Sequence, residues 1–152
     1  MRISAKADYA VRAAAELAAT DSKDPVKGEQ IAHAQSIPIK FLENILVDLR
    51  QAGLVESRRG PDGGYWLARP AEEITVADVM RAAEDPLASV RGQKPEELEY
   101  VGAAGSLQEV WVALRASLRD VLEQVSLADL AAGRLPKGVA ARTRDPEAWQ
   151  RR

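Results

Sequence analysis

Two groups of polar side chains in this sequence have the types and the spacing needed to bind a nucleic acid. Lys40 is followed three and four residues later by Glu43 and Asn44, which places all three on one face of a helix. The carboxylate could accept a hydrogen bond from a cytosine amino group, and the lysine and the amide could reach purine edges. Arg58 and Arg59 open the stretch RRGPDGG, whose glycines, proline and aspartate are typical of a tight turn. Two arginines at the tip of a turn do not contribute to a hydrophobic core, so they are candidates for contacts with a nucleic-acid groove and with phosphates. The alternative for each position is an ordinary solvated surface.

A helix and a β-hairpin between Pro38 and Pro70 must position these side chains. The helix is predicted to begin at Pro38 or Ile39, because proline suits the first position, and to run to residue 52, because Gly53 suits its end. Its apolar stripe recurs at helical steps and consists of Phe41, Leu42, Ile45, Leu46 and Leu49. Apolar runs at 54–55 and 65–67 flank the turn and predict two strands. A polar-faced helix followed at once by an arginine-tipped hairpin is typical of a winged helix-turn-helix, in which the helix enters the major groove.

The residues before this stretch supply the rest of such a domain. Ser4 is a suitable N-cap for an alanine-rich helix over residues 5–19, whose small side chains predict close packing against another helix. A second helix is predicted over 28–35, and Ser36 to Pro38 is the short turn into the third.

The residues after the hairpin predict three further helices and a long connection. Thr75 and Asp78 form a capping box for the first, and an irregular loop then runs to about residue 105. Ser106 and Glu109 form a second capping box, which begins the longest helix. This helix carries a heptad-like seam of apolar residues, which we interpret as a dimer interface rather than as intramolecular core: Leu107, Trp111, Leu114, Leu118, Val121 and Val125. Ser126 caps a short helix that Gly133 ends, and the tail beyond it is predicted to be flexible.

Composition bounds the class of protein. The 152 residues are 46% hydrophobic and 29% charged, as expected for one globular domain with an appended arm. No apolar run approaches a membrane span and the N-terminus lacks the apolar segment of a signal peptide, so we expect a cytoplasmic protein with no membrane partner. The net charge of −2 is unusual for a nucleic-acid-binding protein. Residues 1–70 nevertheless hold ten basic against nine acidic residues, and the local face decides phosphate contact.

The chemistry of enzymes and metal centres has little support in the sequence. No serine stands in a nucleophile elbow, and the glycines of RGPDGGY do not lie between a strand and a helix as those of a phosphate loop do. The chain has no cysteine and its single histidine, His33, has no thiolate to join it. We therefore expect no enzymatic activity, no metal site and no cofactor.

The segments MRISAKADYAVRAAAELA, LENILVDLRQAGLV and RRGPDGGYWLARP resemble the Rrf-two family of bacterial winged-helix transcription regulators, which includes IscR-, CymR- and NsrR-like proteins. The resemblance covers residues 1–80 and continues more loosely through the long helix. It implies a homodimeric, sequence-specific DNA-binding regulator, and we favour a repressor. Many members hold an iron–sulfur cluster through three cysteines before the long helix, which this chain lacks. It therefore resembles the CymR-like branch more, which implies a link to sulfur and cysteine metabolism.

These observations predict a mainly α-helical fold with a small β-hairpin. We expect a winged helix-turn-helix domain over 1–84, an effector loop or linker over 85–105, a dimerisation helix over 106–132 and the flexible tail over 133–152. The residues expected to contact double-stranded DNA, at an inverted-repeat operator, are Arg2, Lys6, Lys40, Glu43, Asn44, Arg50, Arg58, Arg59, Gly63, Gly64 and Tyr65. A small molecule or partner protein that controls binding would dock at the loop. The alternative function is a winged-helix module that binds another protein and no DNA.

Overall fold

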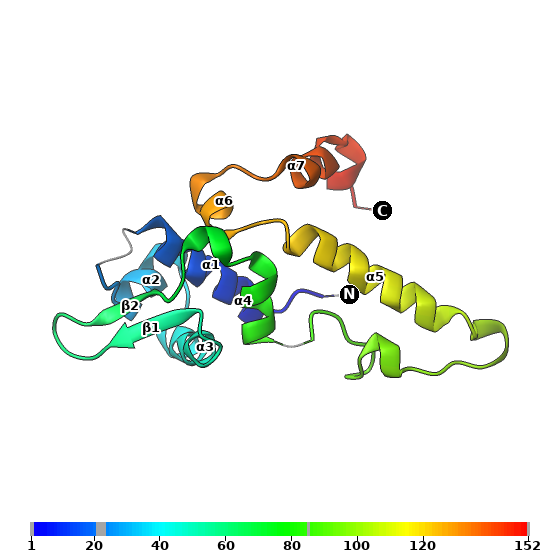
Figure 1. Ribbon diagram of the computed structural model, residues 1–152, viewed down its shortest axis with the longest axis horizontal. Helices are drawn as coiled ribbons and strands as arrows, with labels where there is room; N and C mark the ends of the chain where they lie inside the picture. The colour runs from blue at the N-terminus through cyan, green and yellow to red at the C-terminus, as the bar shows by residue number, and fades with distance from the viewer. Residues whose placement is uncertain (1, 21–23, 85, 152) are drawn as a thin grey trace.

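The computed structural model describes residues 2–20, 24–84 and 86–151, and confirms a mainly helical chain with one two-stranded antiparallel hairpin (Figure 1). The elements are α1 (Ala5–Ala19), α2 (Gly28–Gln35), α3 (Ile39–Gln51), β1 (Val55–Arg58), β2 (Gly64–Leu67), α4 (Val76–Ala83), α5 (Leu107–Leu122), α6 (Leu127–Ala132) and α7 (Lys137–Arg144). Short 3-10 turns cover Ala71–Glu73, Pro95–Glu97, Gly102–Ala104 and Pro146–Trp149.

Helix α1 is the centre of the N-terminal domain and packs against α2, α3, α4 and α6. Its buried face consists of four alanines and one leucine, so neighbouring helices approach it closely: Ala7, Ala10, Ala13, Ala14 and Leu17. Leu42, Ile45, Leu46 and Leu49 of α3 fill the space beside it and are fully buried. Burial of each such side chain contributes about 1.5–3 kcal/mol, which fixes the inner face of α3 and leaves its outer face to solvent.

The predicted helix caps are confirmed at α1, α4 and α6. The Ser4 side chain accepts a hydrogen bond from the Ala7 backbone N–H, and Thr75 and Asp78 cap each other reciprocally. Ser126 and Asp129 do the same at α6, which Gly133 ends at a φ of 66°. The capping box predicted at Ser106 is wrong, because Ser106 has a ψ of 1° rather than an extended backbone and its side chain makes no capping hydrogen bond.

The chain after α5 returns to the N-terminal domain. The Val76 N–H donates to the Val125 carbonyl at 2.9 Å, and the Leu127 N–H donates to the Ile74 carbonyl at 2.8 Å. Leu127 is fully buried in the core beside α1. Val125, which was expected in the dimer seam, lies beyond the end of α5. It is only 6% exposed and therefore belongs to the hydrophobic core of its own chain.

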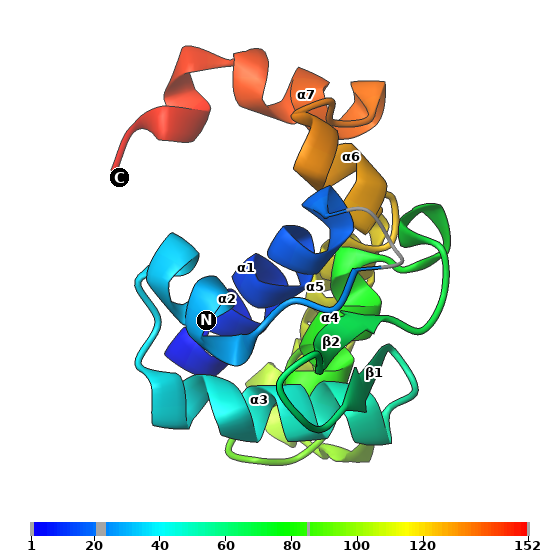
Figure 2. The same ribbon diagram turned by 90° about the vertical axis from the view of Figure 1, so that its left-hand side faces the viewer.

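The segment expected to be a flexible tail contains regular structure. Helix α7 buries Val139, and Arg142 pairs with Asp120 of α5 at 2.8 Å. The Trp149 indole N–H donates to the Thr143 carbonyl at 2.7 Å, which holds the last turn against α7. The C-terminal residues therefore form a short helical arm that lies on the side of the molecule opposite α3 (Figure 2).

Candidate nucleic-acid interface

The outer face of α3 carries a set of unengaged polar side chains. Lys40, Glu43 and Asn44 are exposed, and none of them makes a hydrogen bond or ion pair within the part of the chain that the structure describes. Val47 continues this face one turn later and is 40% exposed. The face thus presents a cation, a carboxylate and an amide that are free to bind an external partner, followed by an apolar surface that suits a thymine methyl group.

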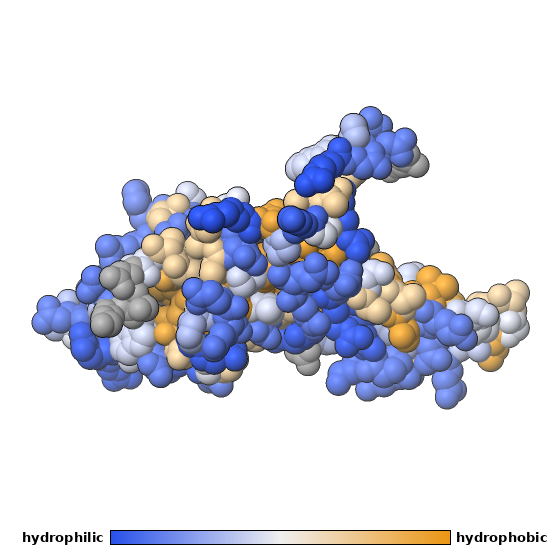
Figure 3. Space-filling model, turned by 45° about the horizontal axis from the view of Figure 1, so that its top comes forward, coloured by the Kyte–Doolittle hydropathy of each residue, from blue (hydrophilic) through white to orange (hydrophobic). Residues whose placement is uncertain are grey.

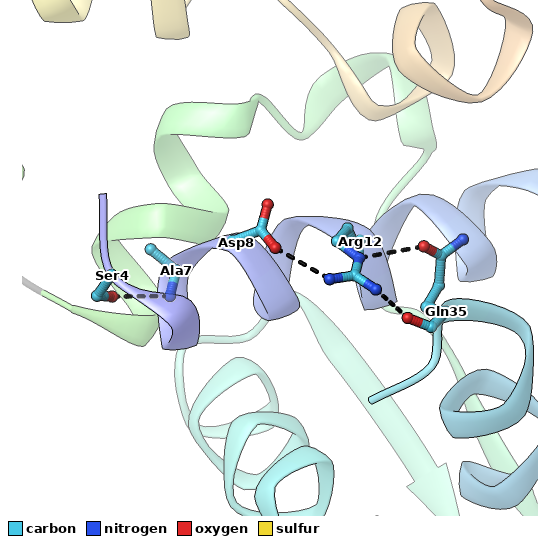
Figure 4. Close-up of polar contacts among 5 residues, drawn as sticks. All are labelled: Ser4, Ala7, Asp8, Arg12 and Gln35. Carbon is cyan, nitrogen blue, oxygen red and sulfur yellow. Dashed lines mark hydrogen bonds and ion pairs between the residues drawn. The ribbon is translucent and has the colours of Figure 1, made fainter. Parts of the chain in front are cut away.

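The turn between α2 and α3 sets the direction of this face, and Arg12 of α1 holds that turn (Figure 4). Its Nε donates to the Gln35 side-chain oxygen at 3.2 Å, and its Nη2 donates to the Gln35 backbone carbonyl at the end of α2. Its Nη1 bonds Asp8 at 3.0 Å. The same guanidinium lies over the Tyr9 ring at 5.1 Å, and that ring meets Phe41 of α3 edge-on at 5.5 Å. Arg12 therefore ties the first helix to the end of α2, and the Tyr9 ring below it contacts α3.

The wing is a four-residue antiparallel ladder closed by a turn over residues 59–63. Strands β1 and β2 pair Val55 with Leu67 at one end and Arg58 with Gly64 at the other. A Cβ on Gly63 would lie 2.0 Å from the Arg58 carbonyl oxygen, and a Cβ on Gly64 would lie 2.7 Å from the Val26 carbonyl oxygen. Gly63 and Gly64, expected among the DNA contacts, thus have a conformational role, because no side chain fits where the backbone closes.

Lys27, which the sequence analysis did not single out, anchors the wing to the N-terminus of α2. Its ammonium group donates to the Gly60 carbonyl at 3.1 Å and to the Pro61 carbonyl at 2.6 Å. Next to it, Val26 and Tyr65 exchange two backbone hydrogen bonds of 2.8 Å, so β2 is paired on both sides there. Nothing in the local sequence signals these contacts, which join residues more than 30 positions apart.

The two wing arginines are not equivalent. Arg58 donates to the Asp62 carbonyl at 2.9 Å, across its own turn. Arg59 is exposed and makes no hydrogen bond or ion pair among the described residues. Arg59 is therefore the wing cation that is available to a groove or a phosphate, while Arg58 is partly engaged in holding the wing closed.

The structure places the remaining candidates in other roles. Lys6 pairs with Asp48 of α3 at 2.8 Å, and Arg50 donates to the Ser57 hydroxyl at 3.2 Å, so both brace α3. The Tyr65 side chain is half-buried against the core. Arg2 lines a cavity of about 650 Å³ between the N-terminal segment, the loop at 86–91 and α5. The residues that converge on one free surface are thus Lys40, Glu43 and Asn44, with Arg59 on the neighbouring wing.

The residues of α5 that were expected in the dimer interface are only partly covered by their own chain. None of the 16 residues of this helix is buried, although the helix carries a strong apolar stripe. Trp111 and Leu114 line the 650 Å³ cavity, and Leu118 lines a smaller one of about 80 Å³. Apolar surface is visible along the part of the molecule that α5 and the preceding loop form (Figure 3). The domain therefore covers its own longest helix only loosely.

Comparison with known proteins identifies the kind of molecule that this geometry belongs to. The family model Rrf2, described as an iron-dependent transcriptional regulator, matches residues 3–133. A Mycobacterium tuberculosis (strain H37Rv) protein named as an HTH-type transcriptional regulator is 54% identical over 140 residues, which is 92% of this chain and 87% of that protein. The transcriptional regulator CymR of Bacillus subtilis is 34% identical over 131 residues, covering 86% of this chain and 90% of CymR.

Solved structures agree with these sequence relatives. The structure of CymR, the global cysteine regulator of B. subtilis, matches with a TM-score of 0.68 at 30% identity and covers 88% of this chain and 98% of CymR. The structure of T. potens IscR matches with a TM-score of 0.69 at 30% identity and covers 100% of this chain and 93% of IscR. These relatives bear the names of transcriptional regulators rather than of enzymes.

The iron in the family's description does not fit the residues of this chain. A cluster needs soft thiolate ligands, and the sequence has no cysteine. Within residues 2–20, 24–84 and 86–151, no three His, Asp or Glu side chains come together in a way that could hold a metal ion. The same ranges contain no helix long and apolar enough to cross a membrane.

A free polar face on α3, an adjacent glycine-closed wing and a family match over most of the sequence lead to one conclusion. This chain belongs to the Rrf2 family of winged-helix, DNA-binding transcriptional regulators.

Proposed function

We propose that the protein is a homodimeric, sequence-specific repressor that binds an inverted-repeat operator and carries no iron–sulfur cluster. The observation that supports this most directly is the outer face of α3, where Lys40, Glu43 and Asn44 have no partner within the described chain. Base recognition requires free donors and acceptors on an exposed helix face, and this face provides them.

In the proposed complex α3 lies in the major groove and the wing follows the flanking groove. Glu43 accepts from a cytosine amino group, and Lys40 and Asn44 bind purine edges. Arg59 binds the phosphate backbone or the adjacent groove, held in place by the Lys27 contacts to the wing turn. Lys6 and Arg50 affect DNA binding indirectly, because each is engaged within the chain and supports the position of α3.

Pairing of two copies through α5 is supported by the state of that helix in the single chain. Leu114 is 37% exposed and Val110 is 53% exposed, and no residue of α5 is buried. An amphipathic helix whose apolar stripe is exposed gains stability when a second helix buries that stripe. A two-fold dimer would set two recognition helices about 34 Å or a multiple apart, so the operator would be an inverted repeat.

Control by a small molecule or a protein fits best at the loop over 86–105 and the 650 Å³ cavity beside it. The cavity wall includes Ser4, the N-cap of α1, and Trp111 and Leu114 of α5. A ligand bound there would change operator affinity only if it bound the two arrangements of the dimer with different affinity. The CymR likeness supports genes of sulfur and cysteine metabolism as targets.

The test is selection of genomic DNA fragments by the purified protein, followed by footprinting and titration at several salt concentrations. We expect a narrow two-fold footprint, and an affinity that falls steeply with salt as counterions are released. Glu43→Gln should relax base preference at one position of each half-site. A protein that protects no fragment at low salt would instead be a winged-helix module for protein partners.

Repression is tested separately from binding. Deletion of the gene should raise the transcripts next to the selected fragments, and transcripts that fall on deletion would make the protein an activator. Added sulfur metabolites should shift the melting temperature of the protein if one of them is the effector.

A further inference from the structure

The C-terminal arm, residues 134–151, is an exposed basic surface that the DNA-binding role does not use. It holds five basic residues against two acidic ones. Arg134, Lys137, Arg144 and Arg151 are exposed and make no ion pair within the described residues. Trp149 projects from the same arm and is 76% exposed. A large aromatic ring that is surrounded by basic residues and held in place by a hydrogen bond is typical of an interaction surface.

The arm is fixed to one end of α5. Arg142 pairs with Asp120, Val139 is buried, and a Cβ on Gly138 would lie 3.1 Å from the Gln124 side chain. The Arg142–Asp120 pair and the approach of Gly138 to Gln124 both lie at or beyond the C-terminal half of the helix. The arm therefore has a defined position relative to the helix that we propose as the dimer interface.

The opposite end of α5 carries the complementary surface. The acidic segment, residues 95–109, contains four glutamates and no basic residue. Glu96 is engaged with Arg115, and a backbone hydrogen bond together with this arginine lowers the pKa of Glu96. Glu99 and Glu109 are exposed and make no ion pair among the described residues, and Val101 between them is 87% exposed.

Within one chain these two surfaces are too far apart to neutralise each other. Glu109 and Asp120, where the arm is anchored, are 11 helical positions or about 17 Å apart, which exceeds the screening length of about 8–10 Å at physiological salt. If two α5 helices pair antiparallel, the N-terminal end of one lies beside the C-terminal end of the other. The two-fold axis then brings each acidic segment beside the partner's arm, twice per dimer.

We infer that the C-terminal arm binds the acidic segment of a second copy of this chain and so sets the antiparallel orientation of the dimer. Trp149 packs on the exposed apolar surface around the partner's Val101, and Lys137 and Arg144 lie opposite the partner's Glu99 and Glu109. Contact of the arm with the same DNA duplex is disfavoured, because α7 and α3 lie on opposite sides of the molecule (Figure 2). This inference rests on the proposed dimer.

A charge swap tests it. One full-length variant carries Lys137→Glu and Arg144→Glu, and a second carries Glu99→Lys and Glu109→Lys. A matched control carries Glu72→Lys and Glu73→Lys on an exposed turn outside α5, the arm and the acidic segment. Circular dichroism checks that each is folded. Sedimentation should show that the first two variants each dimerise about tenfold or more weakly than the unmodified protein and the control, because like charges then face each other.

Mixing decides the outcome. An equimolar mixture of the two weakened variants, resolved by native mass spectrometry, should form mixed dimers as tightly as the unmodified protein, since both contacts are again between opposite charges. Variants that dimerise normally, or weakened variants that do not recover on mixing, would overturn the arm contact while the dimer stands. An arm variant that loses only DNA affinity would overturn it in favour of DNA. A monomeric unmodified protein would overturn the proposed dimer itself.

Discussion

At the scale of single residues, the described interface depends on which charged side chains are free and which are already engaged. Arg58 and Arg59 are adjacent and chemically identical, yet only Arg58 donates across the wing turn, to the Asp62 carbonyl. Lys40 is free on α3, whereas Lys6 pairs with Asp48. Whether a cation is available to a phosphate or a base therefore depends on its pairing within the chain and not on the number of cations.

Arg59→Ala should weaken operator binding by about 1–3 kcal/mol if the guanidinium contacts a base edge, and should reduce the salt dependence if it contacts a phosphate. Titration of labelled operator at two salt concentrations separates these cases. Arg58→Ala is the matched variant, and we expect it to lower affinity less and to lower the melting temperature more. Equal affinity for Arg59→Ala and the unmodified protein would remove the wing tip from the interface.

Lys27→Met should weaken operator binding because the wing turn loses two hydrogen bonds from the ammonium group. If Lys27 acts by positioning Arg59, the loss should nearly vanish in an Arg59→Ala background, where there is no contact left to position. Lys94→Met, an exposed site before a distant 3-10 turn, controls for the lost charge. Additive losses in the double variant would mean that Lys27 meets DNA on its own.

At the scale of elements, α1 determines how the recognition helix is presented. Its alanines allow α3, α4 and α6 to approach, Arg12 binds the carbonyl at the end of α2, and Lys6 reaches Asp48 on α3. The wing depends in the same way on α2, through Lys27 and the Val26–Tyr65 bridge. The two elements that we propose to face DNA, α3 and the wing, are thus each supported by a preceding helix.

Gly63→Ala should distort the wing, since the added Cβ would lie 2.0 Å from the Arg58 carbonyl oxygen and the backbone must shift. We expect about a tenfold loss of operator affinity, equivalent to about 1.4 kcal/mol, with a smaller effect on thermal stability because residues 58–62 of the same turn are exposed. Gly53→Ala provides the comparison. Gly53 has a φ of 76° with open space around it, so its variant should lose about 1 kcal/mol or more of stability through strain and little affinity.

At the scale of the whole molecule, the winged domain and α5 differ in how well one chain can bury them. The core around α1 is closed by α6, which returns after α5 and buries Leu127. By contrast, α5 has no buried residue, and its Leu114 and Leu118 line cavities. In the proposed dimer, a second copy would cover the apolar residues of this helix.

Leu114→Glu should abolish the dimer, because an unpaired carboxylate would be placed in the apolar seam. Sedimentation should then show a monomer, and operator affinity should fall because two linked half-site contacts become one. Ala116→Glu, an exposed position on the opposite face of α5, is the control and should leave the dimer intact. A dimeric Leu114→Glu protein would assign the seam to the core of its own chain.

Local sequence patterns were sufficient to predict the elements that neighbouring residues cause. Apolar spacing over residues 39–52 predicted α3, reciprocal caps at Thr75 and Ser126 predicted the starts of α4 and α6, and the glycine-rich turn predicted the wing. The free polar face of α3 followed from the same spacing, since a helix that buries one side must present the other. These features depend on neighbours within a few positions of one another.

Contacts between residues that are far apart in the sequence became apparent only from the packing of the elements. This packing moved Val125 from the expected seam into the core, because α6 packs back on α1, and it ordered the expected tail through Val139 and the Arg142–Asp120 pair. Lys6 pairs with Asp48 and Arg50 with Ser57, so both contact or support α3. Lys27 donates a hydrogen bond to the wing turn, 33 positions away in the sequence. A side chain's local pattern fixes the direction in which it points from its own element. Its partner is set by the packing of other elements around it, and that information is absent from any single stretch of the chain.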